Sequence, residues 1–538
     1  MKNKILTSSI LAIALLGSTY AFSVTKTLSQ IVKDVKIETG DANELGIGAF
    51  SNLNSFDNDG FNHGVKKSYL KYVKEFGTGE NNNHTPLKND QDALKYFSKH
   101  SLTSQYSDDG HEYVEMFNNF YFESSIAISA GFQIANAFNG MDGAFDGVFK
   151  KANGIDTSLA NSNKAAIVLL DDSSLSKKYD NASSISFAAE GAGYLAAIGA
   201  AVYTQYDVIK NKKENANIVM WGGMPFPTVY DFMSGFAQGI TLFNKKYKSQ
   251  DWYKKIVLWN GGLKQGDEIS DTAVYGDAAN EKDANAWYTK GFSATTGVSD
   301  GDMAKVKTRN AIKAKASVVF PIAGGNTSIA EAEIAKNLNT STRMMGIDAD
   351  SSLSAKEPKL YLGTAEKNLE MGGYLGLWAM DDADDDGKRN FIDNDAISEA
   401  PKEYASWLLA GNTPGAQLHG DINNGGVEFN YVNRGIILED ENQSNGYSKD
   451  LVDAWMFFAD KINKQDDIEG FENFLNLAKL EVKNTGIEFA DTQFITADAN
   501  TNQTHSNLTW LWITLGFILG LCVIWLIIWL VVRKKKNF

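Results

Sequence analysis

The chain has 538 residues, with 51 basic and 66 acidic side chains and a formal net charge of −15. This length suits two or three domains with a large core, and the acidic balance is unsuited to nucleic acid, which binds clustered Lys and Arg. The single cysteine is Cys522, so the residues before it form neither disulfides nor thiolate metal sites.

The first segment has the order of residues found in a secretory signal. Two lysines within residues 1–4 precede an apolar or small stretch from Ile5 to Val24, which contains small residues up to Ala21. We expect residues 1–25 to form a signal peptide cleaved after Ala21, or an uncleaved signal anchor. Both interpretations place the following residues outside the cell.

The central part alternates short apolar runs with helical patterns, which is typical of a parallel α/β sheet. The runs are apolar on both faces, as strands covered by helices on both sides must be. Several end in Gly or Asp, at the edge where open α/β sheets bind ligands. Helices are predicted over 188–204 and 228–247, and strands over 166–170, 218–221, 256–259, 317–321 and 344–348.

Residues 382–393 have the spacing of a calcium loop. Acidic or amide side chains alternate around Gly387, which permits the bend that wraps a hard cation. The final Asp393 resembles the shorter extracellular calcium loops, whereas Arg389 stands where an apolar residue is usual, and the alternative is a solvated acidic loop. A structural Ca²⁺ is expected to bind Asp382, Asp384, Asp386, the Lys388 carbonyl, Asn390 and Asp393.

The last segment predicts a membrane anchor. A polar spacer over 496–508 leads to residues 509–532, which contain no charged side chain and are long enough for a bilayer core of about 30 Å. The basic residues of the tail, 533–538, favour the cytoplasmic side. We therefore expect a single-pass protein of the cell membrane, with a large extracellular N-terminal part and a cytoplasmic C-terminus.

Short motifs between these ends follow a characteristic order. They are Ser55-Phe56-Asp57-Asn58-Asp59-Gly60-Phe61-Asn62, the Glu190–Ala197 segment, Gly222-Gly223-Met224-Pro225, Phe232–Phe236, Ala323-Gly324-Gly325, Gly346–Asp350 and Thr364–Lys367. Together they resemble the basic membrane protein family, the purine-nucleoside-binding receptors of bacterial ABC importers. The chain departs from the family in lacking its lipid-bearing cysteine.

The resemblance implies a type I periplasmic-binding-protein fold, an α/β architecture of two lobes that each hold a doubly wound parallel sheet. Lobe 1 would comprise residues 34–184 and 363–440, and lobe 2 residues 185–362 and 441–495. The lobes, joined by three crossovers, would close on a purine nucleoside and present it to an ABC permease.

The resemblance also implies a binding site. Aromatic rings would cover the base, an amide would meet its edge, and a charged pair would bind the ribose hydroxyls. Simpler readings remain open, because Phe61 can staple a helix start, Asn62 can cap it and Asp348 can cap the following helix. The implied residues are Phe61, Met224 or Phe226 at the base, Asn62 at its edge, Asp171 also reaching the base, the pair Asp348 and Lys367 at the ribose, and the backbone of Gly324 nearby.

The sequence favours a receptor over an enzyme. It contains no P-loop, no Gly-x-Ser-x-Gly and no His-Glu-x-x-His, its six histidines show no ligand spacing, and no catalytic cofactor is expected. Two alternatives remain: a surface adhesin or structural protein that reuses the fold without a transport role, and the same receptor fold with a sugar ligand.

The calcium hypothesis predicts a melting temperature that depends on calcium. An ion bound only by the folded loop stabilises the protein in proportion to the logarithm of its concentration above the dissociation constant, and extracellular loops have dissociation constants of about 10⁻⁴–10⁻³ M. Differential scanning calorimetry up to millimolar Ca²⁺ should show this rise in the wild type and not in the Asp384→Ala, Asp386→Ala double variant. Equal melting of both proteins with and without calcium would show a merely acidic loop.

Overall fold

A computed structural model describes much of the central part of the chain. Its described residues are 46–52, 56, 60–78, 85–104, 124–130, 166–173, 175–177, 182–223, 227–262, 287–289, 300–322, 324–337, 340–381, 390–391, 400–409, 414–439 and 445–485. The predicted signal at 1–25, the spacer at 496–508, the membrane segment at 509–532 and the basic tail lie outside them. Within the described residues, no helix is both long and apolar enough to span a bilayer.

The chain packs into two compact units, and it passes from one to the other at 188/189, 365/366 and 428/429. The sequence analysis placed these passages at 184/185, 362/363 and 440/441. The second passage falls within the strand Tyr361–Lys367 and the third within the strand Val427–Asn430, so each of these strands has residues in both units.

The first unit is built on a sheet of six strands with the order β11-β5-β4-β3-β1-β2. Each pairing whose register is defined in this sheet is parallel, as in the match of Ile126 with Ala166. The strands are β1 (Gly46–Asn52), β2 (Ser101–Ser104), β3 (Ser124–Ala130), β4 (Ala166–Leu170), β5 (Ala182–Phe187) and β11 (Ala416–Gly420).

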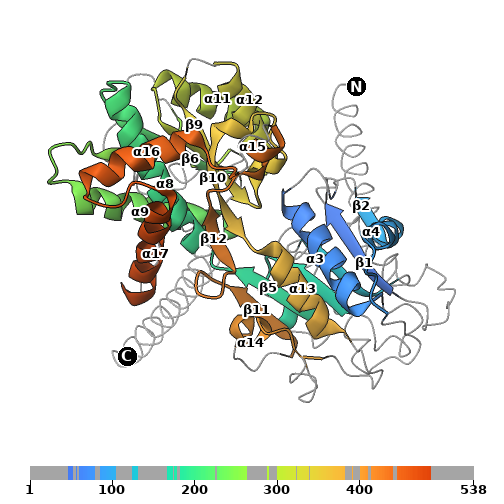
Figure 1. Cartoon of the computed structure of the whole chain (residues 1–538). Helices are drawn as coiled ribbons and strands as arrows, with labels where there is room; N and C mark the ends of the chain where they lie inside the picture. Colours follow the sequence, from blue (N-terminus) through green and yellow to red (C-terminus); the bar gives the residue numbers. More distant parts are fainter. Residues whose placement is uncertain are drawn as a thin grey trace, which may run out of the picture. The chain divides into compact units, whose positions relative to one another are not determined.

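Two helices cover this sheet side by side, and small residues let them approach each other and the sheet closely (Figure 1). A Cβ atom on Gly373 would lie 2.3 Å from the Ser68 hydroxyl oxygen, and one on Gly376 would lie 2.6 Å from a Val168 methyl. The helices of the unit are α3 (Gly60–Phe76), α4 (Asp90–Lys99), α13 (Leu369–Met380) and the short α14 (Tyr404–Trp407), with a 3-10 turn η5 (Leu175–Lys177); the two that cover the sheet are α3 and α13.

The second unit repeats the same strand plan, with the order β12-β10-β9-β8-β6-β7. In both sheets the direction of winding reverses beside the first strand, which is the switch point of an open parallel sheet. The strands are β6 (Ala216–Gly222), β7 (Ile256–Trp259), β8 (Val318–Ile322), β9 (Arg343–Asp348), β10 (Tyr361–Lys367) and β12 (Val427–Asn430).

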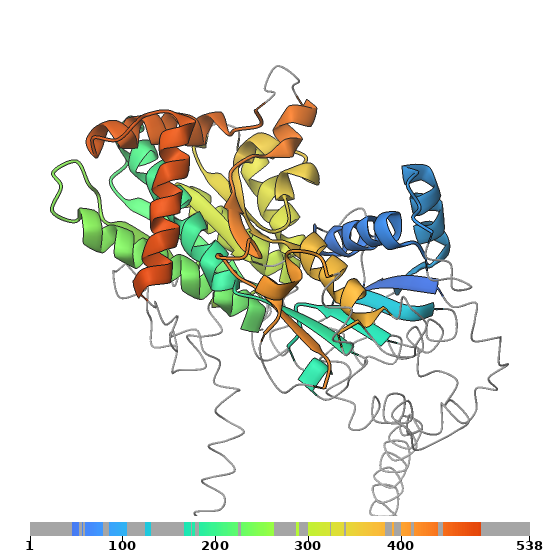
Figure 2. The ribbon, with the colours of Figure 1, turned by 60° about the horizontal axis from the view of Figure 1, so that its bottom comes forward.

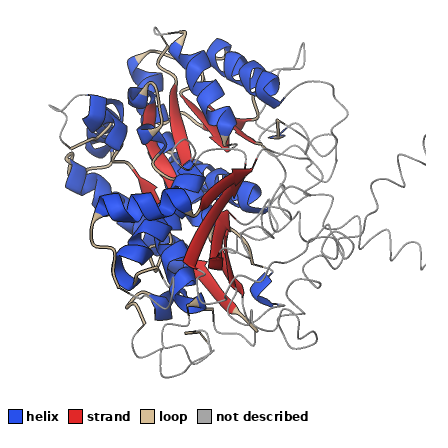
Figure 3. Cartoon of the chain, turned by 90° about the vertical axis from the view of Figure 1, so that its right-hand side faces the viewer, coloured by secondary structure: helices blue, strands red, loops and turns tan. Residues whose placement is uncertain are grey.

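Helices pack around this second sheet (Figure 3). They are α8 (Ala189–Lys210), α9 (Pro227–Tyr247), α11 (Asp300–Lys313), α12 (Gly325–Ala335), α15 (Arg434–Glu439), α16 (Lys449–Lys461) and α17 (Ile468–Thr485), with 3-10 turns η9 (Ser351–Leu353) and η10 (Pro358–Leu360). Of these, α8, α9 and α12 contact its strands, whereas α16 and α17 pack on α8. Figure 2 shows α17 beside α8 and α9 within the unit. Rings of Trp455, Phe458 and Phe474 hold α16 to α17, with centroids 5.3 to 6.2 Å apart.

The helices α8 and α9 touch backbone to backbone. A Cβ atom on Gly193 would lie 2.3 Å from the Phe232 carbonyl oxygen, and one on Gly235 would lie 1.8 Å from the Glu190 carbonyl oxygen. No side chain fits at either position without separating the helices, which explains the small residues of both segments.

The strands predicted at 166–170 and 256–259 coincide with β4 and β7, and the other three predicted strands overlap β6, β8 and β9. The helices predicted over 188–204 and 228–247 correspond to α8 and α9, and each predicted start lies within one residue of the observed start. The sequence analysis proposed no strand at β1, β2, β3, β5, β10, β11 or β12. Several of these carry Ser or Gly in place of a continuous apolar run.

The close helix contact gives a stability prediction. Gly235→Ala should lower the free energy of unfolding by about 1–3 kcal/mol, because overpacking a tight contact outweighs the better helix propensity of Ala. The matched control is Gly325→Ala at the start of α12, where a Cβ meets nothing within 4 Å. Chemical denaturation of both variants should show the loss only at Gly235; equal curves would contradict the contact.

Candidate functional site

Three residues of the first unit meet at the ends of strands. Asp171 follows β4 directly, Phe187 is the last residue of β5, and Lys367 is the last residue of β10, just beyond the passage at 365/366. The carboxyl ends of parallel strands are where open α/β sheets bind ligands. The candidate site is therefore built on this edge of the first unit.

The centre of the site is a buried ion pair. The Lys367 Nζ donates a hydrogen bond of 2.8 Å to Asp171 Oδ2, and the two side chains are only 2% and 3% exposed. Charges so far from water are stable only when paired and hydrogen bonded. A hydroxyl that reaches such a pair finds a strong acceptor and a strong donor side by side.

Aromatic rings flank the ammonium group. The Lys367 Nζ lies 5.8 Å from the centroid of the Phe61 ring and 6.0 Å from that of Phe187, both within cation–π range. Phe61 comes from the first turn of α3 and is partly exposed, whereas Phe187 is buried edge-on against Trp407. The sequence analysis did not assign Phe187 to the site, because it proposed no strand at β5, which Phe187 ends.

The backbone at Asp171 is strained. Its φ is 64°, in the left-handed region that non-glycine residues seldom adopt and Asp tolerates better than most. Asp348 has the same φ of 64° and is the last residue of β9, which occupies in the second sheet the place that β4 occupies in the first. Such strain concentrates at functional sites. The equivalence of these two aspartates became visible only with the strand order.

The neighbouring Asp172 fixes the turn that carries Asp171. Its Oδ2 accepts hydrogen bonds of 2.8 Å from the Ser184 hydroxyl and 3.1 Å from the Leu175 amide. The turn is thus tied to β5 and to η5, which holds the strained Asp171 in place.

The partner of Lys367 differs from the one that the sequence interpretation assigned. That interpretation paired Lys367 with Asp348, whereas the structure pairs it with Asp171. The strand β10 passes from the second unit into the first at 365/366, so Lys367 belongs to the same unit as Asp171.

The remaining predicted ligand residues are distributed as follows. Asn62 is buried on α3, with 1% of its surface exposed. Gly324 is the N-cap of α12 with φ 43°, and open space surrounds the position of its missing Cβ. Met224 and Phe226 lie outside the described residues.

Of the expected calcium ligands, only Asn390 is described; Asp382, Asp384, Asp386, Lys388 and Asp393 lie outside the described residues. The Asn390 side-chain amide donates a hydrogen bond of 2.9 Å to the Trp378 carbonyl oxygen near the end of α13. In the part of the chain that the structure describes, no group of three or more His, Cys, Asp or Glu residues could hold a metal ion.

Comparison with known proteins gives structural likeness only. No family model and no curated protein matches the chain. A solute-binding protein of an ABC transporter system from Aeropyrum pernix K1 is similar over 82% of this chain and 92% of its own, with 12% identity and a TM-score of 0.48. A ribose-bound LacI family regulator from Enterococcus faecium covers 71% and 96% at 11% identity and TM-score 0.34.

A glucose-galactose binding protein from Geobacillus stearothermophilus is similar over 62% of this chain and 90% of its own, with 12% identity and a TM-score of 0.33. These neighbours are solute-binding proteins and a transcriptional regulator. Because all three TM-scores are below 0.5, we take no ligand from them.

The buried ion pair gives a prediction about stability. Asp171→Asn keeps the shape and tolerates the positive φ, but it removes the carboxylate from the buried Lys367, so unfolding free energy should fall by about 3–5 kcal/mol. The Asp171→Asn, Lys367→Met double variant removes both charges and should be more stable than Asp171→Asn alone. Denaturant titration of the two singles and the double measures this coupling, and strictly additive losses would exclude it.

Proposed function

We propose that the chain is a solute-binding receptor that recognises a purine nucleoside. The observation that carries the proposal is the buried Lys367–Asp171 ion pair between aromatic rings at the carboxyl ends of parallel strands. A nucleoside combines a flat base with a ribose diol. Rings suit the base, and a desolvated acid–base pair suits the diol.

The nucleoside is preferred over a free sugar for a specific reason. Phe61 is partly exposed and stands at the start of α3, so one face of its ring is a candidate platform for a base. A hexose would need more hydrogen-bonding partners than the single ion pair supplies, whereas a base gains affinity from stacking alone. The sugar receptor is the second candidate, because the ion pair by itself also suits a diol.

The proposal includes a cellular setting that rests on the sequence. The apolar segment 509–532 would hold the receptor in the cell membrane, and an ABC permease in the same membrane would take the solute. In the competing role, that of an adhesin or structural protein, the pair would serve packing only and the chain would bind neither nucleoside nor sugar.

Ligand preference distinguishes these roles. Isothermal titration calorimetry of the full-length chain with adenosine, guanosine, inosine, ribose and glucose should show at least one purine nucleoside binding tighter than glucose by about tenfold or more. Phe61→Ala should then weaken nucleoside binding by about 0.5–1.5 kcal/mol, the usual value of one aromatic contact. Glucose binding as tight as that of every nucleoside would favour the sugar receptor.

A matched control separates stacking from general damage. Phe457→Ala removes a partly buried ring of α16 that packs on Tyr206 in the second unit, and it should leave nucleoside affinity unchanged. Native mass spectrometry of the freshly purified chain provides an independent readout of a co-purified nucleoside. Absence of binding in both experiments would favour the adhesin role.

A further inference from the structure

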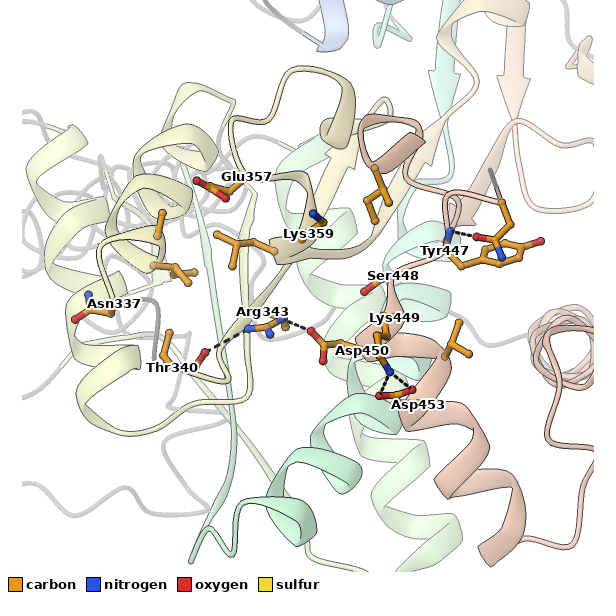
Figure 4. Close-up of a pocket in the computed structure, with 16 residues that line it drawn as sticks. Asn337, Thr340, Arg343, Glu357, Lys359, Tyr447, Ser448, Lys449, Asp450 and Asp453 are labelled. Atoms are coloured by element: carbon orange, nitrogen blue, oxygen red, sulfur yellow. Dashed lines mark hydrogen bonds and ion pairs between the residues drawn. The ribbon is translucent and has the colours of Figure 1, made fainter. Parts of the chain in front are cut away.

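A cavity of about 720 Å³ lies in the second unit, and its lining includes no residue of the nucleoside site (Figure 4). Its volume is in the range of small-molecule sites. Arg343 at the start of β9, Lys359 and Leu360 before β10, and the first turn of α16 line it. It therefore sits at the amino ends of β9 and β10, whereas the nucleoside site uses carboxyl ends of strands.

The first turn of α16 opens on the cavity with unused hydrogen-bonding groups. Its N-cap, Ser448, is 1% exposed and lines the cavity. Within the described residues, it makes no side-chain capping bond and its Oγ has no hydrogen-bond partner. Figure 4 shows the Ser448 hydroxyl on the side of Arg343. The first amides of a helix also lack intrahelical partners and carry partial positive charge. This end of the cavity suits a carboxylate.

The charged side chains beside this turn largely cancel. Arg343 Nε binds Asp450 Oδ2 at 2.6 Å, and Lys449 Nζ binds Asp453 at 2.7 Å (Figure 4). The hydrogen bond to Asp453 raises the pKa of Lys449, which keeps it cationic. Each of these ion pairs carries no net charge. The Arg343 Nη2 donates no hydrogen bond among the described residues, so this group and the amino end of α16 can together bind one negative charge.

A single negative charge remains on another wall. The Glu357 carboxylate lines the cavity, is exposed, and makes no hydrogen bond or ion pair within the described residues, where only the backbone of Glu357 is bonded: its amide to Glu331 and its carbonyl to the Leu360 amide. In Figure 4 it lies apart from Ser448. Apolar side chains complete the lining: Ile334, Leu360, Ile436 and Val452.

We propose that this cavity is a second ligand site for an apolar zwitterion, an amino acid or short peptide with free ends. The ligand carboxylate meets Ser448, Arg343 and the amides of α16, its ammonium group meets Glu357, and its side chains contact the apolar wall. A dianion is disfavoured, because the lining holds as many acidic as basic side chains. The site does not depend on the nucleoside proposal, since the two share no residue.

The test pairs changes in the protein with changes in a probe. The probe is the dipeptide Leu-Leu, compared with its C-terminal amide and its N-acetyl derivative, titrated into the full-length chain by calorimetry. Ser448→Ala and amidation should each weaken binding about fivefold, the effect of one hydrogen bond or exposed ion pair, and together no more than either alone. Glu357→Gln and acetylation should likewise each weaken binding about fivefold, and together no more than either alone.

Controls keep the outcomes separate. Ser448→Ala removes no capping bond and Glu357→Gln changes an exposed side chain, so both variants should melt as the wild type does. Phe61→Ala should leave dipeptide binding unchanged while weakening nucleoside binding. The proposal is overturned if Leu-Leu does not bind at about 5 mM, if both cavity variants bind it as tightly as the wild type does, or if Phe61→Ala abolishes its binding.

Discussion

The contact on which the candidate site depends is the one between Lys367 and Asp171. Each charge loses its hydration on burial, and the loss is offset only because the two groups meet at hydrogen-bonding distance. That meeting fixes the end of β10 against the end of β4, although 196 residues separate the pair in sequence. Phe61 and Phe187 take their places around this fixed charge, and the strained turn at Asp171 is held by the hydrogen bonds of Asp172.

The motifs that carry the family resemblance serve packing as much as binding. Gly193 and Gly235, within the two helical motifs, lie where α8 and α9 meet at backbone distance. Gly346 is similarly enclosed, because a Cβ there would lie 2.4 Å from the Ser351 hydroxyl oxygen. A motif of this kind indicates how the elements pack. Ligand class must therefore come from the side chains at the strand ends.

The sequence was informative where burial and hydrophobicity coincide. The strands β4 and β7 consist of residues that are apolar on both faces, and the pattern located them to the residue. It failed for β5, whose Ser183 and Ser184 are fully buried but polar. The hydroxyl of Ser184 is satisfied by Asp172, an interaction that depends on tertiary structure and leaves no trace in a hydropathy pattern.

The sequence indicated candidate residues for the site but not their pairing. Asp171 and Asp348 follow or end apolar runs, whereas Lys367 was a candidate only through the Thr364–Lys367 motif of the family resemblance. Which of the aspartates meets Lys367 depends on strand order and on where β10 passes between units, and neither is encoded locally.

The cavity at the start of α16 also could not be recognised from the sequence. Its lining comes from helix ends, turns and strand starts, and its charges alternate in sign, so in sequence these residues look like an ordinary solvated surface. Only their arrangement distinguishes them. Three ion pairs, Arg343–Asp450, Lys449–Asp453 and Lys359–Glu439, neutralise most of the charge, and what remains is one helix end, one buried hydroxyl and one carboxylate around an apolar wall. Two sites with different chemistry can therefore coexist in one chain, because the amino and carboxyl ends of parallel strands offer separate edges on which to build them.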